Sequence, residues 1–282
     1  MVRVESGEGG LPRAVLRTAD GEAHVYLHGA HVTHWQPAGR APVLFMSAHA
    51  RFAADAPIRG GVPVIFPWFG PRAGDPRSPA HGFARVRPWR LERQGDDDVV
   101  LALDADPTTR AAWPHDFALR LHVALGAQLT MTLAVTNTSA TTWKYEEALH
   151  TYLAVGDVTV AEVHGLEDAV YLDKTDSMAR KRHPREPMRI RAEVDRVFTG
   201  HTGVCVVDDP AGKRRLRIGK RGSATTVVWN PWTERARALP DLGDDEWSRM
   251  VCVETANTGD DAVTLAPGAR HKMAAILSCE TS

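Results

Sequence analysis

Leu119-Arg-Leu-His-Val-Ala-Leu125 and Leu129-Thr-Met-Thr-Leu-Ala-Val135 are the most regular stretches of this 282-residue sequence. Apolar side chains occupy every second position in both, which is the period of a β-strand with one face in a core. Gly126-Ala-Gln128 between them has the length of a short hairpin loop, and Asn137-Thr-Ser139 places turn-forming residues after the second stretch. The sequence therefore predicts an antiparallel hairpin here.

Shorter runs of the same kind recur along the whole chain, and Gly, Pro, Asp or Asn separates most of them. Many short strands with frequent turns are typical of an all-β sandwich and not of βαβ units. Helical periodicity is confined to a short turn over residues 108–113. We predict an all-β fold of antiparallel strands, built as a large two-sheet sandwich in one domain over residues 1–282. The other predicted strands cover residues 14–17, 23–27, 30–36, 99–104, 151–155, 158–163, 203–207, 215–218, 225–229, 250–254, 262–265 and 272–277.

The composition is that of an ordinary globular protein, with 43% hydrophobic and 24% charged residues. This balance excludes a disordered, collagen-like or coiled-coil chain. Because 34 Lys and Arg residues are offset by 35 Asp and Glu residues, the net charge is -1. Such a balance offers no general attraction to nucleic acid or to an anionic membrane, and we expect neither as a partner.

The chain is expected to be cytoplasmic. No apolar run approaches the roughly 18 residues of a membrane span, and the first residues lack the apolar core of a signal peptide. Cys205, Cys252 and Cys279 are odd in number and too far apart for a CxxC site, so we expect buried reduced thiols.

Histidines recur at close spacing in His24, His28, His31 and His34. On a helix three of them would share a face and suit a metal ion, but the surrounding pattern is that of a strand. Strand alternation separates His31 from His28 and His34 unless Gly29-Ala30 forms a bulge, so we expect histidines on a solvated sheet face. The sequence also lacks the motifs of nucleotide-binding, zinc-protease and serine-hydrolase sites, and no metal or cofactor is predicted.

Residues 174–191 form the least regular segment, with a high density of charge and two prolines. This composition predicts an exposed loop. Charges in such loops are usually solvated, and steering of an anionic ligand is the alternative.

Two arginines stand in unusual surroundings. Arg59 precedes Gly60-Gly61 in an apolar, proline-rich stretch, where a guanidinium beside a tight turn can bind phosphate or carboxylate through two hydrogen bonds. A structural role, in which a buried arginine pairs with an acidic neighbour, is the alternative. Arg85 ends the motif His81-Gly-Phe-Ala-Arg85, which suits a loop that holds a polar ligand.

Two further residues are candidates for proton transfer. His150 lies in Tyr145-Glu-Glu-Ala-Leu-His-Thr-Tyr-Leu153, and a histidine near its ordinary pKa can donate a proton at neutral pH. Glu254 ends the apolar run that begins at Met250, and a carboxylate at a strand end can act as a base. The alternative for each is a surface residue without a function. In a β-sandwich the loops that carry these candidates are expected to converge on one cleft.

Taken in order, eight motifs resemble the glucose-6-phosphate 1-epimerase (hexose-6-phosphate mutarotase) branch of the aldose 1-epimerase superfamily. The resemblance covers residues 28 to 277 and implies the galactose-mutarotase-like β-supersandwich, which agrees with the strand pattern. The motifs are Arg59-Gly-Gly-Val-Pro63, Phe66-Pro-Trp-Phe-Gly70, His81-Gly-Phe-Ala-Arg85, Trp113-Pro-His-Asp-Phe117, Leu149-His-Thr-Tyr152, Glu193-Val-Asp-Arg-Val-Phe198, Val228-Trp-Asn-Pro-Trp232 and Cys252-Val-Glu254.

The reaction implied by this resemblance interconverts the α and β anomers of an aldohexose 6-phosphate through the open-chain aldehyde. By the same resemblance His150 is the general acid and Glu254 the general base. It further implies that Arg59 and Arg85 bind the phosphate, that Asp195 binds the sugar, and that His81 contacts ring hydroxyl groups. No cofactor or metal is implied, and the expected partner is a small sugar phosphate bound to a monomer.

Other positions qualify the resemblance. Trp229 and Trp232 offer an aromatic wall to the sugar, with core packing as the alternative for each. Ala80 stands where some members of the family have a glutamine that contacts the substrate, so that hydrogen bond is missing here.

Three functions remain open at this stage. The chain is a mutarotase of phosphorylated hexoses, a mutarotase of free hexoses, or a sandwich that binds sugar phosphates without catalysis. The paired arginines favour the first over the second, and the presence of both His150 and Glu254 favours an enzyme. A retaining glycosidase would need a second close carboxylate and ranks below all three.

Overall fold

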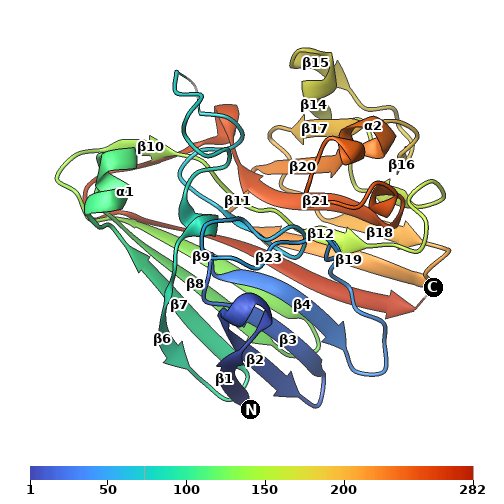
Figure 1. Cartoon of the computed structure of the whole chain (residues 1–282). Coiled ribbons are helices and arrows are strands. Elements are labelled where there is room, and N and C mark those ends of the chain that lie inside the picture. Colours follow the sequence, from blue (N-terminus) through green and yellow to red (C-terminus); the bar gives the residue numbers. More distant parts are fainter. Residues whose placement is uncertain (73, 282) are drawn as a thin grey trace.

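The predicted hairpin is present as β8 (Phe117–Leu125) and β9 (Leu129–Asn137), which pair antiparallel with Leu121 opposite Leu133 (Figure 1). The structure is a computed structural model that describes residues 1–72 and 74–281. Side chains at alternate positions of both strands are buried, as the alternation of apolar residues predicts.

This hairpin belongs to an antiparallel sheet of nine strands. Because β23 lies near the end of the chain and pairs with β9, the sheet joins segments that are far apart in sequence. In spatial order its strands are β16 (Met188–Arg189), β13 (Glu162–His164), β18 (Cys205–Asp209), β19 (Arg214–Arg221), β23 (Arg270–Thr281), β9, β8, β7 (Asp98–Asp104) and β6 (Arg90–Gln94).

A second antiparallel sheet, of eight strands, lies above the first in the view of Figure 1. Its central strands β20 and β21 carry the motifs around Trp229 and Glu254. The strands are β15 (Ala179–Arg182), β14 (Val170–Asp173), β17 (Val194–Phe198), β20 (Thr225–Asn230), β21 (Met250–Asn257), β11 (Glu147–Leu149) and β5 (Val64–Ile65), with β12 (Tyr152–Ala154) paired to β21.

Smaller elements complete the fold. The N-terminal sheet contains β1 (Val2–Ser6), β2 (Pro12–Thr18), β3 (Gly21–Tyr26) and β4 (His31–Pro37), and a two-stranded sheet pairs β10 (Trp143–Tyr145) with β22 (Val263–Leu265). The helices are α1 (Pro107–Ala112) and α2 (Trp232–Arg237), and the 3-10 turns are η1 (Glu8–Gly10), η2 (Ala84–Val86), η3 (Lys174–Asp176), η4 (Glu246–Arg249) and η5 (Gly259–Asp261). In the part of the chain that the structure describes, no helix has the length and apolar character needed to cross a bilayer.

The predicted helical turn is α1, and its first residues explain its position. Asp106 caps the helix by accepting a hydrogen bond from the backbone N–H of Thr109 at 2.7 Å, and Pro107 occupies the first helical position. The helix ends one residue before Trp113, which is buried in the core.

One apolar core lies between the two large sheets. It combines Leu121 and Leu133 of the nine-stranded sheet with Val228 and Val253 of the eight-stranded sheet, all buried. Burying a side chain of this size stabilises the folded state by about 1.5–3 kcal/mol. Within the described residues, the opposite face of the eight-stranded sheet carries two small apolar clusters, one with Cys252 and one with Ala256, and Glu254 lies between these two positions on β21.

Two predictions about local structure are wrong. Residues 158–160 form a turn instead of the start of a strand, and Val160 is exposed, so β13 begins only at Glu162. Residues 174–191 are not one exposed loop, because they contain η3, β15 and β16. β15 has the sequence Ala-Arg-Lys-Arg and lies at the sheet edge, where charged side chains are common and conceal the strand pattern.

The prediction of a solvated histidine face is also wrong in part. His28 and His31 are buried, and their Nε2 atoms lie 2.8 Å from the carbonyl oxygens of Ala56 and Gly60. The segment around Ala56 covers this region of the sheet, and the imidazoles satisfy its carbonyl groups. A register shift follows His24 in β3. Among the residues described, no three His, Cys, Asp or Glu side chains form a group that could hold a metal ion.

Candidate active site

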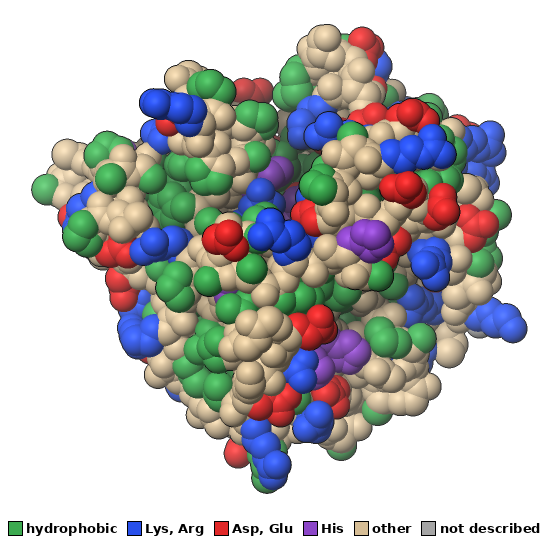
Figure 2. Space-filling model, in the orientation of Figure 1, with side chains coloured by type: hydrophobic (Ala, Val, Ile, Leu, Met, Phe, Trp, Pro, Cys, Tyr) green, Lys and Arg blue, Asp and Glu red, His purple; other side chains and the backbone are tan. Residues whose placement is uncertain are grey.

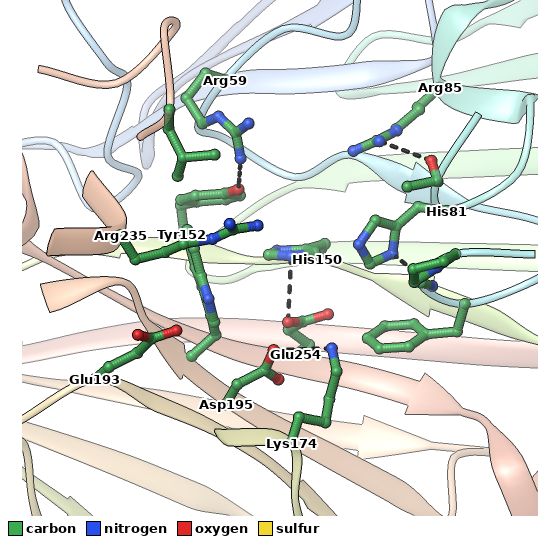
Figure 3. Close-up of a pocket in the computed structure, with 16 residues that line it drawn as sticks. Arg59, His81, Arg85, His150, Tyr152, Lys174, Glu193, Asp195, Arg235 and Glu254 are labelled. Carbon is green, nitrogen blue, oxygen red and sulfur yellow. Dashed lines mark hydrogen bonds and ion pairs between the residues drawn. The ribbon is translucent and has the colours of Figure 1, made fainter. Parts of the chain in front are cut away.

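A cavity of 590 Å³ opens on the outer face of the eight-stranded sheet. Figure 2 shows histidine and cationic side chains inside a hollow on this face of the molecule. All six candidate residues line the cavity, and Figure 3 shows their side chains directed into it. They are Arg59, His81, Arg85, His150, Asp195 and Glu254.

Strand register brings the carboxylates to the cavity. Asp195 of β17 lies opposite Trp229 of β20, and Trp229 lies opposite Cys252 of β21. Glu254 is two residues further along β21, so its side chain points to the same face as that of Cys252. The acidic residues on β17 and β21 therefore share one face, although 59 positions separate their numbers.

His150 and Glu254 are in direct contact at the floor of the cavity. His150 follows β11, and its Nε2 lies 3.3 Å from Oε1 of Glu254. Both side chains are buried, with 9% and 1% of their surface exposed. The ring of Tyr152 stacks on the imidazole with the ring centres 4.8 Å apart, and the ring of Trp229 is nearly perpendicular to both, with its centre 6.1 Å from that of His150 and 5.9 Å from that of Tyr152.

Burial shifts both pKa values toward the uncharged forms. The pKa of His150 is well below its ordinary value, because of burial first and of His81, Arg85 and Arg59 next. Burial, with the charge of Asp195, holds the pKa of Glu254 well above its ordinary value. In the described part of the chain, Oε2 of Glu254 is buried and has no hydrogen-bond partner. A carboxyl oxygen in this state is available to a ligand hydroxyl group.

His81 is held as a neutral donor. Its Nδ1 accepts a hydrogen bond from the backbone N–H of Gly70 at 3.2 Å, so the proton of the neutral ring is on Nε2. Burial, followed by the charge of Arg85, keeps the pKa of His81 well below its ordinary value. The backbone of His81 has φ +65°, a strained conformation for a residue with a side chain. The Nε2–H group can donate to a sugar hydroxyl.

Arg59 lines the cavity and also has the acidic neighbour considered as the alternative for it. Gly60-Gly61 makes the turn that positions it, since a Cβ on Gly61 would lie 2.3 Å from the carbonyl oxygen of Val32. The guanidinium lines the cavity but forms an ion pair with Asp241 at 3.0 Å and donates to the hydroxyl of Tyr152 at 3.0 Å.

Arg85 has fewer hydrogen-bond partners than Arg59. Its Nη2 donates to the carbonyl oxygen of Ala80 at 2.8 Å, and its buried Nε has no partner in residues 1–72 and 74–281. Burial lowers the pKa of Arg85 to about 10, so the guanidinium remains charged at neutral pH.

Asp195 lies beside a lysine. Lys174 Nζ forms an ion pair with Asp195 Oδ2 at 2.8 Å and also lies over the ring of Phe69. Burial raises the pKa of Asp195, while Lys174 and Arg235 act in the opposite direction.

Comparison with known proteins identifies the family. Residues 12–278, nearly the whole sequence, match the family described as aldose 1-epimerase. This chain belongs to the aldose 1-epimerase family.

Relatives of this aldose 1-epimerase family chain include two with the name "putative glucose-6-phosphate 1-epimerase". The protein of Cenchrus ciliaris is 35% identical over 273 residues, which cover 92% of this chain and 82% of the relative. That of Escherichia coli strain K12 is 36% identical over 239 residues, which cover 83% of this chain and 79% of the relative. A crystal structure described as a "putative mutarotase" from Salmonella typhimurium matches with a TM-score of 0.91 and 28% identity, over 100% of this chain and 94% of that one.

These matches confirm the predicted resemblance and the predicted mutarotase-like sandwich, and they show that the chain is an epimerase. Of the two tryptophans predicted as an aromatic wall, Trp229 lines the cavity. Trp232 instead packs against Trp247 with ring centres 4.2 Å apart. Ala80 does line the cavity, and its methyl group offers no hydrogen bond to a substrate.

The sequence reasoning missed other residues that line the cavity or hold its side chains. Tyr152 was within a recognised motif, and Lys174 within the charged segment considered for anion steering. Arg235 follows the motif that ends at Trp232, but nothing in its own surroundings marks it. The pairing of Asp241 with Arg59 joins two distant loops, and no local pattern could have indicated it.

Proposed function

We propose that this epimerase interconverts the α and β anomers of an aldohexose 6-phosphate, with glucose 6-phosphate as the first candidate. The observation that carries the proposal is the contact between His150 and Glu254 in a cavity that also presents the charged guanidinium of Arg85. The pair supports proton transfer at a sugar, and the arginine supports an anionic substrate. The names of the two relatives support glucose 6-phosphate.

In the proposed reaction Glu254 accepts the proton of the anomeric hydroxyl group while His150 donates a proton to the ring oxygen. The C1–O5 bond breaks, its electron pair goes to O5, and a C1 carbonyl group forms. Both oxygens are bonded to C1, so the acid and the base must lie side by side. The 3.3 Å contact between the two side chains meets this requirement. Rotation about C1–C2 followed by ring closure, with the two roles reversed, gives the other anomer.

Burial favours the ring-opening step. Before ring opening the pair is charged, as imidazolium and carboxylate, and after it both groups are neutral. A cavity that lowers the pKa of His150 and raises that of Glu254 stabilises the neutral pair relative to the charged one. The same burial makes the charged pair the less populated form of the empty site, and it opposes ring closure, in which the roles are reversed and the pair becomes charged again.

The remaining residues are proposed to bind the substrate. Arg85 and Arg59 are proposed to contact the phosphate, and Asp195 and the Nε2–H group of His81 to contact hydroxyl groups of the ring. Arg85 supports this best, because it has no carboxylate partner among the residues described. The ion pair of Arg59 with Asp241 favours a second candidate, a mutarotase of free hexoses, because that pairing reduces the charge offered to a phosphate.

An anomerisation assay decides between the two substrates. Polarimetry or exchange NMR would compare glucose 6-phosphate with glucose, galactose 6-phosphate and mannose 6-phosphate. We expect a much larger kcat/KM for a hexose 6-phosphate than for glucose. Equal rates on glucose and glucose 6-phosphate would favour the second candidate, and absence of any acceleration would favour a binding protein.

Variants of the two arginines sharpen the test. A guanidinium–phosphate contact is worth about 1.5–3 kcal/mol, so Arg85→Ala and Arg59→Ala are each expected to raise KM for glucose 6-phosphate by roughly 10- to 150-fold. Lysine at either position should restore binding only in part, because it keeps the charge and loses the planar geometry. The slow rate on glucose is the internal control. Equal losses on both substrates would mean that the arginines support the fold or bind the ring.

A further inference from the structure

A third arginine, Arg235, reaches the cavity from α2. Figure 3 shows its guanidinium directed into the same space as those of Arg59 and Arg85. Neither the sequence motifs nor the proposed proton transfers require a cation on this helix. The question is what Arg235 contributes there.

The position of α2 is well determined by its neighbours. Asn230 is buried, its side-chain oxygen accepts the backbone N–H of Trp232 at 2.9 Å, and its amide donates to the carbonyl oxygens of Trp247 and Met250 at 2.8 Å. Ala236 is buried in the small apolar cluster beside the cavity. Since successive residues of a helix are turned by about 100°, Arg235 and Arg237 project to opposite sides of Ala236. The fold thus directs one arginine into the cavity and the other away from it.

The two arginines differ in their partners. Arg237 forms an ion pair with Glu234 at 3.0 Å on the exposed surface. No carboxylate within the described residues pairs with Arg235. The positive charge of Arg235 nevertheless acts within the site, because it lowers the pKa of Asp195 and so opposes the rise caused by burial.

The other cations of the cavity are partly neutralised. Arg59 and Lys174 each have a carboxylate partner, at 3.0 and 2.8 Å. Arg85 and Arg235 have none in the part of the chain that is described. A phosphate carries close to two negative charges at neutral pH, and these two guanidinium groups are the ones free to balance them.

We propose that Arg235 is a ligand of the substrate's phosphate group and that, with Arg85, it provides most of the discrimination between hexose 6-phosphates and free hexoses. This inference rests on the proposed function. It adds a residue on α2 to Arg85 as a main anion contact and ranks Arg59, which Asp241 already engages, below both. Arg59 then acts as a weaker contact.

Glu193 is the acidic residue that competes with this interpretation. It is exposed and lines the same cavity, and it forms no ion pair within 4.0 Å in the residues described. If the role of Arg235 were only to attract Glu193, removing the carboxylate would change KM for glucose 6-phosphate as much as removing the arginine. If Arg235 binds phosphate, removing the carboxylate relieves repulsion of the substrate.

The test compares Arg235→Ala, Arg235→Lys, Glu193→Gln and the matched control Arg237→Ala in the full chain. With glucose 6-phosphate we expect KM to rise roughly 10- to 150-fold in Arg235→Ala, with a smaller change in kcat and partial recovery in Arg235→Lys. Arg237→Ala should match the wild type, and Glu193→Gln should lower KM. With glucose, which has no phosphate, Arg235→Ala should lose far less kcat/KM than with glucose 6-phosphate, and thermal unfolding should show that each variant is folded.

Inorganic phosphate provides a readout that does not depend on turnover. It should inhibit the wild type competitively, and the inhibition constant should rise in Arg235→Ala but not in Arg237→Ala. An unchanged KM and an unchanged inhibition constant in Arg235→Ala would overturn this inference while leaving a wild-type preference for glucose 6-phosphate intact. So would an equal rise of KM in Glu193→Gln. A wild type that does not prefer the phosphorylated sugar would overturn the proposed function and this inference with it.

Discussion

Glu254→Gln is expected to separate catalysis from folding. The amide has nearly the volume of the carboxyl group, so the side chain can keep its position 3.3 Å from Nε2 of His150 and leave no cavity. It cannot accept the proton of the anomeric hydroxyl group. A general base contributes typically 10²- to 10⁴-fold, so we expect kcat to fall by at least ~10²-fold, equivalent to about 2.7 kcal/mol.

The same substitution should change how stability depends on pH. Burial raises the pKa of Glu254 well above its ordinary value, so the folded protein holds this proton more tightly than the unfolded chain. The stabilisation from this proton is complete below pH 4.5, the ordinary pKa of a glutamate, and is lost as the pH rises through the pKa that Glu254 has in the folded protein. Glutamine has no such proton. The variant should therefore gain stability relative to the wild type as the pH increases.

Two measurements check these statements. Polarimetry at saturating glucose 6-phosphate gives kcat, and urea unfolding of both proteins at pH 5 and pH 8.5 gives the difference in the free energy of unfolding. A folded variant with near-normal kcat would remove Glu254 from the mechanism. A stability difference that is the same at both pH values would contradict the burial argument, whatever the activity shows.

Two further predictions concern the neighbours of this residue. His150→Asn should lower kcat by at least ~10²-fold, because it removes the proposed acid. Burial lowers the pKa of His150, so the wild type loses stability as the pH falls below 6.5, and the variant should lose less in urea unfolding. An equal loss of stability in both proteins would refute this second prediction. Asp241→Asn removes a carboxylate that lies 3.0 Å from Arg59 and competes with a phosphate for it. Such an ion pair is worth about 0.5–1 kcal/mol, so its loss should lower KM for glucose 6-phosphate by roughly 2- to 5-fold. A higher KM would show that Asp241 positions Arg59 and does not compete for it.

Local patterns were sufficient for much of this protein. The alternation in Leu119–Leu125 and Leu129–Val135 indicated the central hairpin, because a strand with one face in the core must repeat with period two. The sequence motifs named all six candidate residues, and each of these lines the cavity. Motifs preserve the type and spacing of residues, and these are properties that can be read along the chain.

The same reading failed where a residue's surroundings come from another part of the chain. β15 has no apolar alternation, because an edge strand can carry charge on both faces, and only its pairing with β14 defines it. His28 is buried by the distant segment around Ala56, which a strand pattern near His28 cannot reveal.

Tertiary structure alone decided how the charges of the cavity are distributed. The sequence identified Arg59 as a possible phosphate ligand and equally as a structural arginine, and only the fold brings Asp241 to within 3.0 Å of it. In the same way the fold left Arg235 without a carboxylate partner among the residues described, on a helix that its sequence does not mark as functional. A guanidinium's role depends on which charges lie within a few ångströms, and charges that meet across distant loops leave no periodic signal in the sequence.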